Sequence, residues 1–215
     1  MTGNPLSPRV FRGAIVAAEA LRPAASVVVF QYNPDEMTRT LEPRTVGGEA
    51  GTGPLRLSGP PIESLQFSVE LDAADQLEVS DPTTVALGVR PALATIELLL
   101  YPPAPTTIAN LALSAAGVVE ILPAPAPLTL LVLGPSRVMP IRLTSCSIVE
   151  QAFDPTLNPI RAKVDLGLKV VGYHDAGAAS AAGTIALANH VALEVAGTLG
   201  TTTSVARAVT DAAGL

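Results

Sequence analysis

The sequence predicts a mainly β domain with one inserted helix and a short helical C-terminal extension. Twenty prolines and seventeen glycines divide its 215 residues into short segments, as is usual in all-β proteins. Two segments, Leu65–Leu71 and Ile160–Val171, alternate apolar and polar residues with the period of a half-buried strand. After Gly172 the composition changes, and Ala, Gly and Thr dominate. We therefore expect a β domain over residues 1–173 and a separate, partly helical segment over residues 174–215.

The N-terminal part predicts three strands and a loop. Val10–Glu19 is the first strand, and Ser26–Asn33 is the second because it is rich in Val and aromatic residues. Pro34 ends the second strand, since proline cannot donate to a central ladder. Met37–Leu41 is expected to be a short third strand, and the Gly-rich Thr45–Gly53 a mobile loop.

The middle of the chain predicts a strand, a loop and the inserted helix. Leu65–Leu71 is the strand, and the acidic stretch Asp72–Asp81 is expected to be a loop. Arg90–Tyr101 is the helix, because Pro91 suits its first turn and two prolines follow Tyr101.

The last strands are the clearest. Thr129–Leu133 and Val138–Val149 predict a hairpin around Gly134–Ser136. Ile160–Val171 predicts a two-faced strand, and residues 184–195 have helical spacing. The residues of the last strand expected in the core are Ile160, Ala162, Val164, Leu166, Leu168 and Val170. Those expected on the other face are Arg161, Lys163, Asp165 and Lys169.

Low charge is the main feature of the composition. Charged residues make up 15% of the chain, against about 25% in typical proteins, and the mean hydropathy is +0.43. Such a chain must cover apolar surface in a membrane or against other subunits. The net charge of −6 and the lack of a basic run argue against nucleic acid as a partner.

A membrane span is not predicted. The apolar run Leu111–Gly134 contains Glu120 and three prolines, and the run Ala181–Leu199 contains His190 and Glu194. Met1–Arg12 has no apolar signal core. We therefore expect a soluble chain without membrane insertion of its own that assembles with other subunits in the cytoplasm.

No cofactor or metal is predicted. His174, His190 and Cys146 are too few for a zinc site, and the single cysteine cannot form an internal disulfide, which suits a reducing compartment. The acidic residues Asp72, Asp75, Glu78 and Asp81 lack the EF-hand spacing, so a solvated loop is the expected reading.

Catalytic residues are not predicted either. Alternation places Cys146 on one strand face with Arg142 and Thr144, without a neighbouring base. No nucleophile-elbow motif occurs, and the glycines of residues 47–53 are not followed by the lysine of a phosphate-binding loop. A pair of carboxylates for acid–base catalysis is neither indicated nor excluded, because the separation of two side chains in space is not visible in a sequence.

Four stretches, in order, resemble the tube-adaptor family of contractile injection systems. Val29–Met37 (VFQYNPDEM) resembles the opening signature of the family, and Val69–Asp75 (VELDAAD) resembles its strand with a following turn. Arg90–Tyr101 resembles its helix, and Phe153–Ala162 (FDPTLNPIRA) resembles its last strand with the turn before it. The resemblance covers roughly residues 10–172. The residues that we assign to the structural and interface motifs are Phe30, Gln31, Tyr32, Asn33, Pro34, Asp72, Asp75, Asn158, Pro159 and Arg161.

The resemblance implies a structural protein rather than an enzyme. The family members are subunits of phage-tail-like particles, so a tail-tube-like β-barrel or sandwich is implied. Six copies would form a baseplate ring that joins the spike hub protein to the inner-tube protein, beside other baseplate or sheath components, in a particle that is released extracellularly. Many members carry a C-terminal LysM-like module, for which Asp175–Leu215 is too short and too rich in Ala. We expect this segment to dock on a baseplate component outside the tube instead.

Two alternatives remain at this point. One is a main inner-tube subunit of such a particle, which would stack without limit. The other is a ligand-binding or enzymatic β-barrel, which would not form rings.

Overall fold

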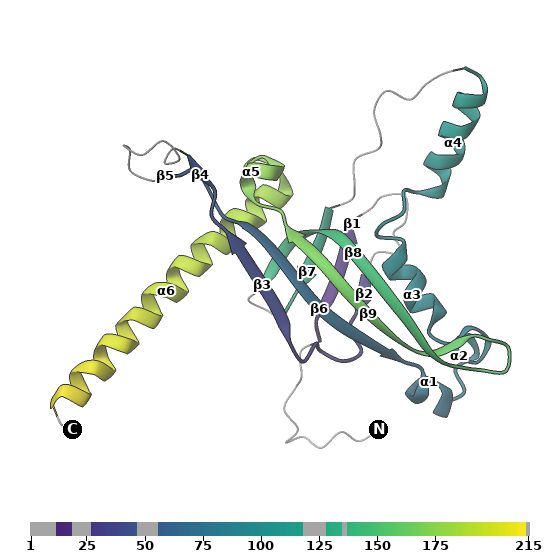
Figure 1. Ribbon diagram of the computed structural model, residues 1–215, viewed down its shortest axis with the longest axis horizontal. Coiled ribbons are helices and arrows are strands. Elements are labelled where there is room, and N and C mark those ends of the chain that lie inside the picture. Colours follow the sequence, from purple (N-terminus) through teal and green to yellow (C-terminus); the bar gives the residue numbers. More distant parts are fainter. Residues whose placement is uncertain (1–11, 19–26, 47–55, 118–127, 135–136, 214–215) are drawn as a thin grey trace.

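One antiparallel sheet of seven strands organises the protein. The computed structural model describes residues 12–18, 27–46, 56–117, 128–134 and 137–213. The strand order is β2-β1-β7-β8-β9-β6-β3 (Figure 1). The seven strands are β1 (Ala14–Ala18), β2 (Val27–Val29), β3 (Met37–Glu42), β6 (Ile62–Asp72), β7 (Leu128–Val132), β8 (Val138–Phe153) and β9 (Pro159–Val170). The mainly β prediction is therefore confirmed.

Several predicted strands match the structure closely. The β7–β8 hairpin and the start of β3 lie where the sequence predicts them. β1 is seen for Ala14–Ala18, and the outer parts of the predicted Val10–Glu19 fall outside the described residues. The predicted strand Ser26–Asn33 is too long at its end, because the ladder of β2 stops at Val29.

The loop expected at Thr45–Gly53 is partly wrong. Its first two residues form β4 (Thr45–Val46), which pairs with β5 (Arg56–Leu57) in a small separate ladder. The remainder of the predicted loop lies outside the described residues.

The prediction of a single inserted helix is wrong. Four helices lie between β6 and β7: α1 (Ala74–Glu78), α2 (Pro82–Leu87), α3 (Arg90–Glu97) and α4 (Ala104–Ala115). α1 lies within the expected loop Asp72–Asp81, and α2 begins directly after it. Asp72 and Asp81 each accept a backbone N–H at the start of one of these helices, from Ala74 and Thr84. α3 follows the predicted helix but ends at Glu97, before Tyr101.

The helix of the C-terminal extension is longer than predicted. A short helix, α5 (Tyr173–Ala176), precedes α6 (Ala181–Ala213), which has 33 residues rather than the twelve expected. Figure 1 shows α6 leaving the sheet and ending far from it. Among the described residues, no helix is long and apolar enough to cross a membrane.

The core lies on one face of the sheet and is covered by α3. Leu93 and Ile96 of α3 are buried there with Phe30, Leu65 and Leu131 from three parts of the chain. The strand β9 is two-faced as predicted. Its residues Ala162, Val164, Leu166 and Leu168 are buried, Ile160 and Val170 are partly buried against them, and Arg161, Lys163 and Asp165 are exposed while Lys169 is half-buried.

Candidate structural and interface site

Four of the ten motif residues meet at one end of the sheet, where β6 ends and β9 begins. We call this region the motif junction and define it by Gln31, Asp72, Asp154, Asn158 and Arg161. It lies beside α1 and α2, at the lower right of Figure 1. Its hydrogen bonds join segments that are up to 89 residues apart in the chain.

The first motif stretch is joined to β6 through Gln31. Its side-chain oxygen accepts the Asp72 N–H at 2.9 Å. The preceding Phe30 is 1% exposed, and its ring meets the Phe67 ring edge-on with centroids 5.7 Å apart. Buried aromatic pairs of this geometry contribute about 0.5–1.5 kcal/mol beyond their area. The motif therefore anchors the end of β2 in the core.

Asn33 fixes the same segment to the start of β1. Its Oδ1 accepts the Gly13 N–H at 2.9 Å, and the Phe30 N–H donates to the Gly13 carbonyl at 2.8 Å. A Cβ at Gly13 would lie 2.6 Å from the Phe30 ring, so this close approach requires glycine. Pro34 is half-buried beside this contact, and Tyr32 is exposed.

Asp72 and Arg161 form the ion pair of the junction. Arg161 donates from Nε at 2.9 Å and from Nη2 at 2.6 Å to one Asp72 oxygen, and the other oxygen accepts the Ala74 N–H at 2.8 Å. The Ala74 bond and Arg161 hold the pKa of Asp72 below its usual value, against the effect of burial. Asp72 likewise raises the pKa of Arg161. Both charged groups therefore bind to other groups of the same chain and hold the end of β6 to the start of β9.

The turn between β8 and β9 is closed by Asp154. Its Oδ1 accepts the backbone N–H groups of Thr156 at 2.7 Å and Asn158 at 2.8 Å, and its Oδ2 accepts the Asn158 side-chain amide at 3.0 Å. The bonds from Asn158 and Thr156 lower the pKa of Asp154 to about 2. This turn lets Leu157 adopt a left-handed φ of 66°.

The same turn is joined to the loop between α2 and α3. The Asn158 amide also donates to the Ala86 carbonyl at 3.0 Å, and the Val89 N–H donates to the Pro159 carbonyl at 2.9 Å. Gly88 has a φ of 58°, and a Cβ there would lie 2.1 Å from the Pro159 oxygen. Only glycine therefore allows this contact.

Two acidic residues differ from their predicted roles. Asp75 is exposed on α1 and takes no part in the junction contacts described above. Asp81 was not assigned as a motif residue, yet it caps α2 by accepting the Thr84 N–H at 2.9 Å. The signal for this cap was present in the sequence, since Asp81 directly precedes Pro82 at the first helical position.

A small hollow of about 160 Å³ adjoins the junction. Its lining residues include Gln31, Asp72, Gln76 and Asp81, and among the described residues it contains no His, Lys or Cys. Because Gln31, Asp72 and Asp81 already bond to backbone groups, the hollow is built from groups that hold the fold together.

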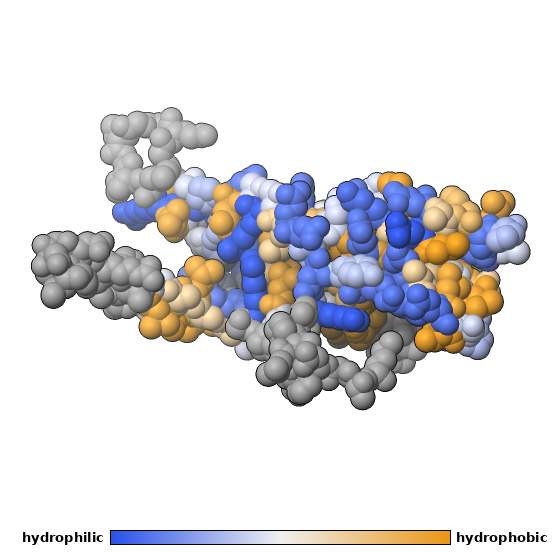
Figure 2. Space-filling view, turned by 90° about the horizontal axis from the view of Figure 1, so that it is seen from below, coloured by the Kyte–Doolittle hydropathy of each residue, from blue (hydrophilic) through white to orange (hydrophobic). Residues whose placement is uncertain are grey.

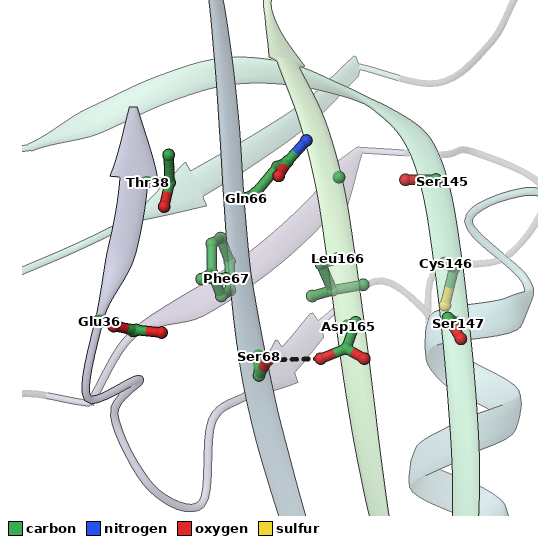
Figure 3. A pocket seen from close by; sticks show the side chains of 11 residues that line it. Glu36, Thr38, Gln66, Phe67, Ser68, Ser145, Cys146, Ser147, Asp165 and Leu166 are labelled. Carbon is green, nitrogen blue, oxygen red and sulfur yellow. Dashed lines mark hydrogen bonds between the residues drawn. The ribbon is translucent and has the colours of Figure 1, made fainter. Parts of the chain in front are cut away.

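A second, shallow groove of about 460 Å³ crosses the outer face of β3, β6, β9 and β8 (Figure 3). Polar side chains line most of it, and the Ser68 hydroxyl donates to Asp165. A Cβ at Gly167 would lie 2.2 Å from Ser145 Oγ, so an alanine there would require this hydroxyl to rotate away.

The predicted position of Cys146 is wrong. β8 has a register shift relative to β9 between Leu143 and Ser145. Because of this shift Cys146 lies opposite the buried Leu166, whereas Arg142 lies opposite Lys169 on the other face. Cys146 therefore lies partly buried against the core, away from the face of Arg142. Burial and the nearby Glu97 raise the pKa of the thiol, which disfavours the nucleophilic thiolate.

The two histidines lie where α5 meets α6. The ring of Tyr173 has the His174 ring at 5.1 Å and the His190 ring stacked at 6.1 Å. Within the described part of the chain, no three His, Cys, Asp or Glu residues gather in a way that could hold a metal ion, and this includes the acidic residues of α1 and α2.

The sequence matches no protein-family model, and no curated protein is similar to it.

Proposed function

We propose that the chain is a structural subunit of a contractile injection system, in which it forms a ring between the spike hub and the inner tube. One observation favours this function most. Residues from three of the four motif stretches meet in the motif junction, and their polar groups bond to one another and to the backbone. Such an arrangement is what we expect of residues that keep the end of the sheet in a fixed shape, so that subunits can assemble in a ring.

Both edges of the sheet support a role in self-association. β2 exposes Val27 and Val29 at 53% and 52%, and β3 is exposed along almost its entire length. β2 and β3 each pair on one side only among the described strands, so each edge offers backbone groups for a further strand. The tail-tube-like barrel or sandwich is part of this proposal, since neighbouring copies would continue the open sheet.

The apolar surface supports the same conclusion. Figure 2 shows apolar residues gathered at both ends of the molecule. The exposed large apolar residues include Val79 directly after α1, Val85 on α2 and Leu157 in the turn between β8 and β9, and also Leu187 and Val191 on α6. Exposed apolar residues in groups of this kind mark surfaces that other subunits cover. The proposed partners are therefore five further copies, the spike hub, the inner tube and the neighbouring baseplate or sheath components.

Particle assembly tests the proposal. Particle-producing cells that lack this chain should give spikes and sheaths but no particles with an attached tube, and the full-length chain should restore them. Cys146→Ser or His174→Ala should restore them equally well, because neither side chain has a catalytic role in the proposal. Normal particles without the chain, or a measurable turnover lost in either variant, would contradict the proposed function.

A further inference from the structure

A cavity of about 660 Å³ lies at the end of the sheet where β9 leads into α5. Three parts of the chain form it: the residues that follow α3, the strands β7 and β8, and the segment from α5 to the start of α6 (Figure 1). It shares no residue with the motif junction, and the proposed function gives it no role.

Apolar side chains form most of the wall of this cavity. The larger ones are Leu99, Leu100, Leu128, Ile141, Leu143 and Val171. Concave sites of about 300–1,000 Å³ with mostly apolar walls and a few polar groups are the usual binding sites of small organic molecules. The cavity therefore has the size and the lining of a site for a small molecule with an apolar part.

The negative charge in the lining is already compensated. Asp175 is the acidic residue among the described lining residues, and Arg44 Nη2 donates to its two oxygens at 2.7 and 2.9 Å. Burial alone would raise the pKa of Asp175. The bonds from Arg44 and the Gly172 N–H, together with the charge of Lys169, hold this pKa below its usual value. Asp175 therefore stays charged and bound to its own chain.

Arg142 also lines the cavity, and its charge is not compensated. Among the described residues it forms no salt bridge. Its register partner on β9 is Lys169, and like charges directly opposite each other in a sheet repel. The cations Arg44, Lys169 and Arg142 thus share the single carboxylate of Asp175. An excess of positive charge remains at the polar end of the cavity, although the whole chain has a net charge of −6.

The two features together select the ligand. We propose that the cavity binds a single-chain amphiphile with an anionic head group, of which a medium-chain fatty acid is the simplest example. The head group binds at Arg142, because a planar guanidinium can donate two parallel hydrogen bonds to a carboxylate. The chain packs on the apolar wall between the end of α3 and β8. A neutral or cationic head group would leave Arg142 uncompensated, and an anion without a chain would leave the wall uncovered.

Isothermal titration calorimetry with the full-length chain tests this site. The probes are decanoate, decanol and hexanoate, each below the concentration at which it forms micelles. Decanol has the same chain without the charge, and hexanoate has the same charge on a shorter chain. We expect decanoate to bind about tenfold or more tightly than decanol. Hexanoate should bind more weakly than decanoate by about fourfold for each buried CH₂ that it lacks. No binding of decanoate up to about 1 mM, or equal affinity for decanol, would overturn the proposal.

Arg142→Gln tests the head-group contact. It removes the charge and should abolish the preference for decanoate over decanol, while decanol binds as before. Lys163→Gln is the matched control, because it removes an exposed cation of β9 outside the cavity and should leave both affinities unchanged. An equal loss in the two variants would show that decanoate responds only to the overall charge, which would contradict the contact with Arg142.

Ala182→Leu tests where the chain of the ligand lies. Ala182 is half-buried near the start of α6 and lines the cavity, so a leucine should fill part of it and weaken both decanoate and decanol by about tenfold or more. Ala188→Leu is the control at an exposed position of the same helix outside the cavity. Normal binding by a folded Ala182→Leu variant would exclude this cavity as the site. Circular dichroism shows whether the variant is folded, and Arg142→Gln decides the question if it is not.

This inference does not rest on the proposed function. The binding is measured on the isolated chain, so absence of the chain from injection particles would not affect it. A failure to bind decanoate would likewise leave the structural role unchanged.

Discussion

Leu166→Ala tests the assignment of the core most sharply. Leu166 is 2% exposed and lies on β9 opposite Phe67 of β6 and Cys146 of β8. Because strands on both sides fix the backbone, the cavity left by three missing carbons can collapse only in part. We expect a loss of about 3–5 kcal/mol in the free energy of unfolding, the upper part of the range for such substitutions.

Urea denaturation followed by far-ultraviolet circular dichroism measures this loss, since the chain has no Trp for fluorescence. With a slope of about 2–3 kcal/mol per molar urea, the midpoint should fall by about 1–2.5 M. Lys163→Ala is the matched control on the exposed face of the same strand, and it should change stability by no more than about 0.5 kcal/mol. A loss below about 1 kcal/mol for Leu166→Ala, or equal losses for the two variants, would refute the two-faced strand.

Three further predictions follow from the structure. Gly167→Ala should change the free energy of unfolding by about 1 kcal/mol or less in urea denaturation, because the Ser145 hydroxyl that its Cβ would meet can rotate away; a loss above about 2 kcal/mol would show that this hydroxyl is held in place. The folded pKa of Asp154 is about 2, below its usual 3.8, so its charged form stabilises the fold above about pH 4 and this contribution is lost as the pH falls towards 2. The stability advantage of the wild type over Asp154→Asn should therefore disappear over that acid range, and a constant difference would be evidence against the assignment. Deletion of residues 176–215 should leave a folded β domain, because the main core contains no described residue beyond Val170, while particle assembly should weaken. An unfolded product would show that the segment belongs to the core, and particles that assemble and fire normally would show that it has no docking role.

The sequence predicts the central strands well because each has one buried face. The alternation of Ile160–Val171 is enough to place β9, since β6 and β8 pair with it on both sides and its core residues all lie on one face of the sheet. The register shift at Thr144 is not predictable in this way, because it depends on how β8 aligns with β9. That shift is why the expected position of Cys146 is wrong.

The helices are predicted less well because their patterns are weak. α4 has no charged face, and α6 is built from Ala, Gly and Thr, whose spacing gives little amphipathic contrast. α1 and α2 are each only one or two turns long, although Asp81 before Pro82 marks the start of α2.

The candidate site was predicted as separate turn motifs rather than as one junction. The Asn158–Pro159 dipeptide predicts a turn from local chemistry alone. The bond between Gln31 and Asp72 joins residues 41 positions apart, and its existence depends on how β2 and β6 meet in space. Local patterns therefore identify the residues, and only the fold brings them together.

Cryo-electron microscopy of particles assembled with the full-length chain tests the central claim most directly. The proposed function predicts density for a single ring of six copies between the spike and the first layer of the inner tube, with each sheet continued by its neighbour. Density for this chain along the entire tube would identify a main tube subunit instead, and its absence from the particle would contradict the structural role.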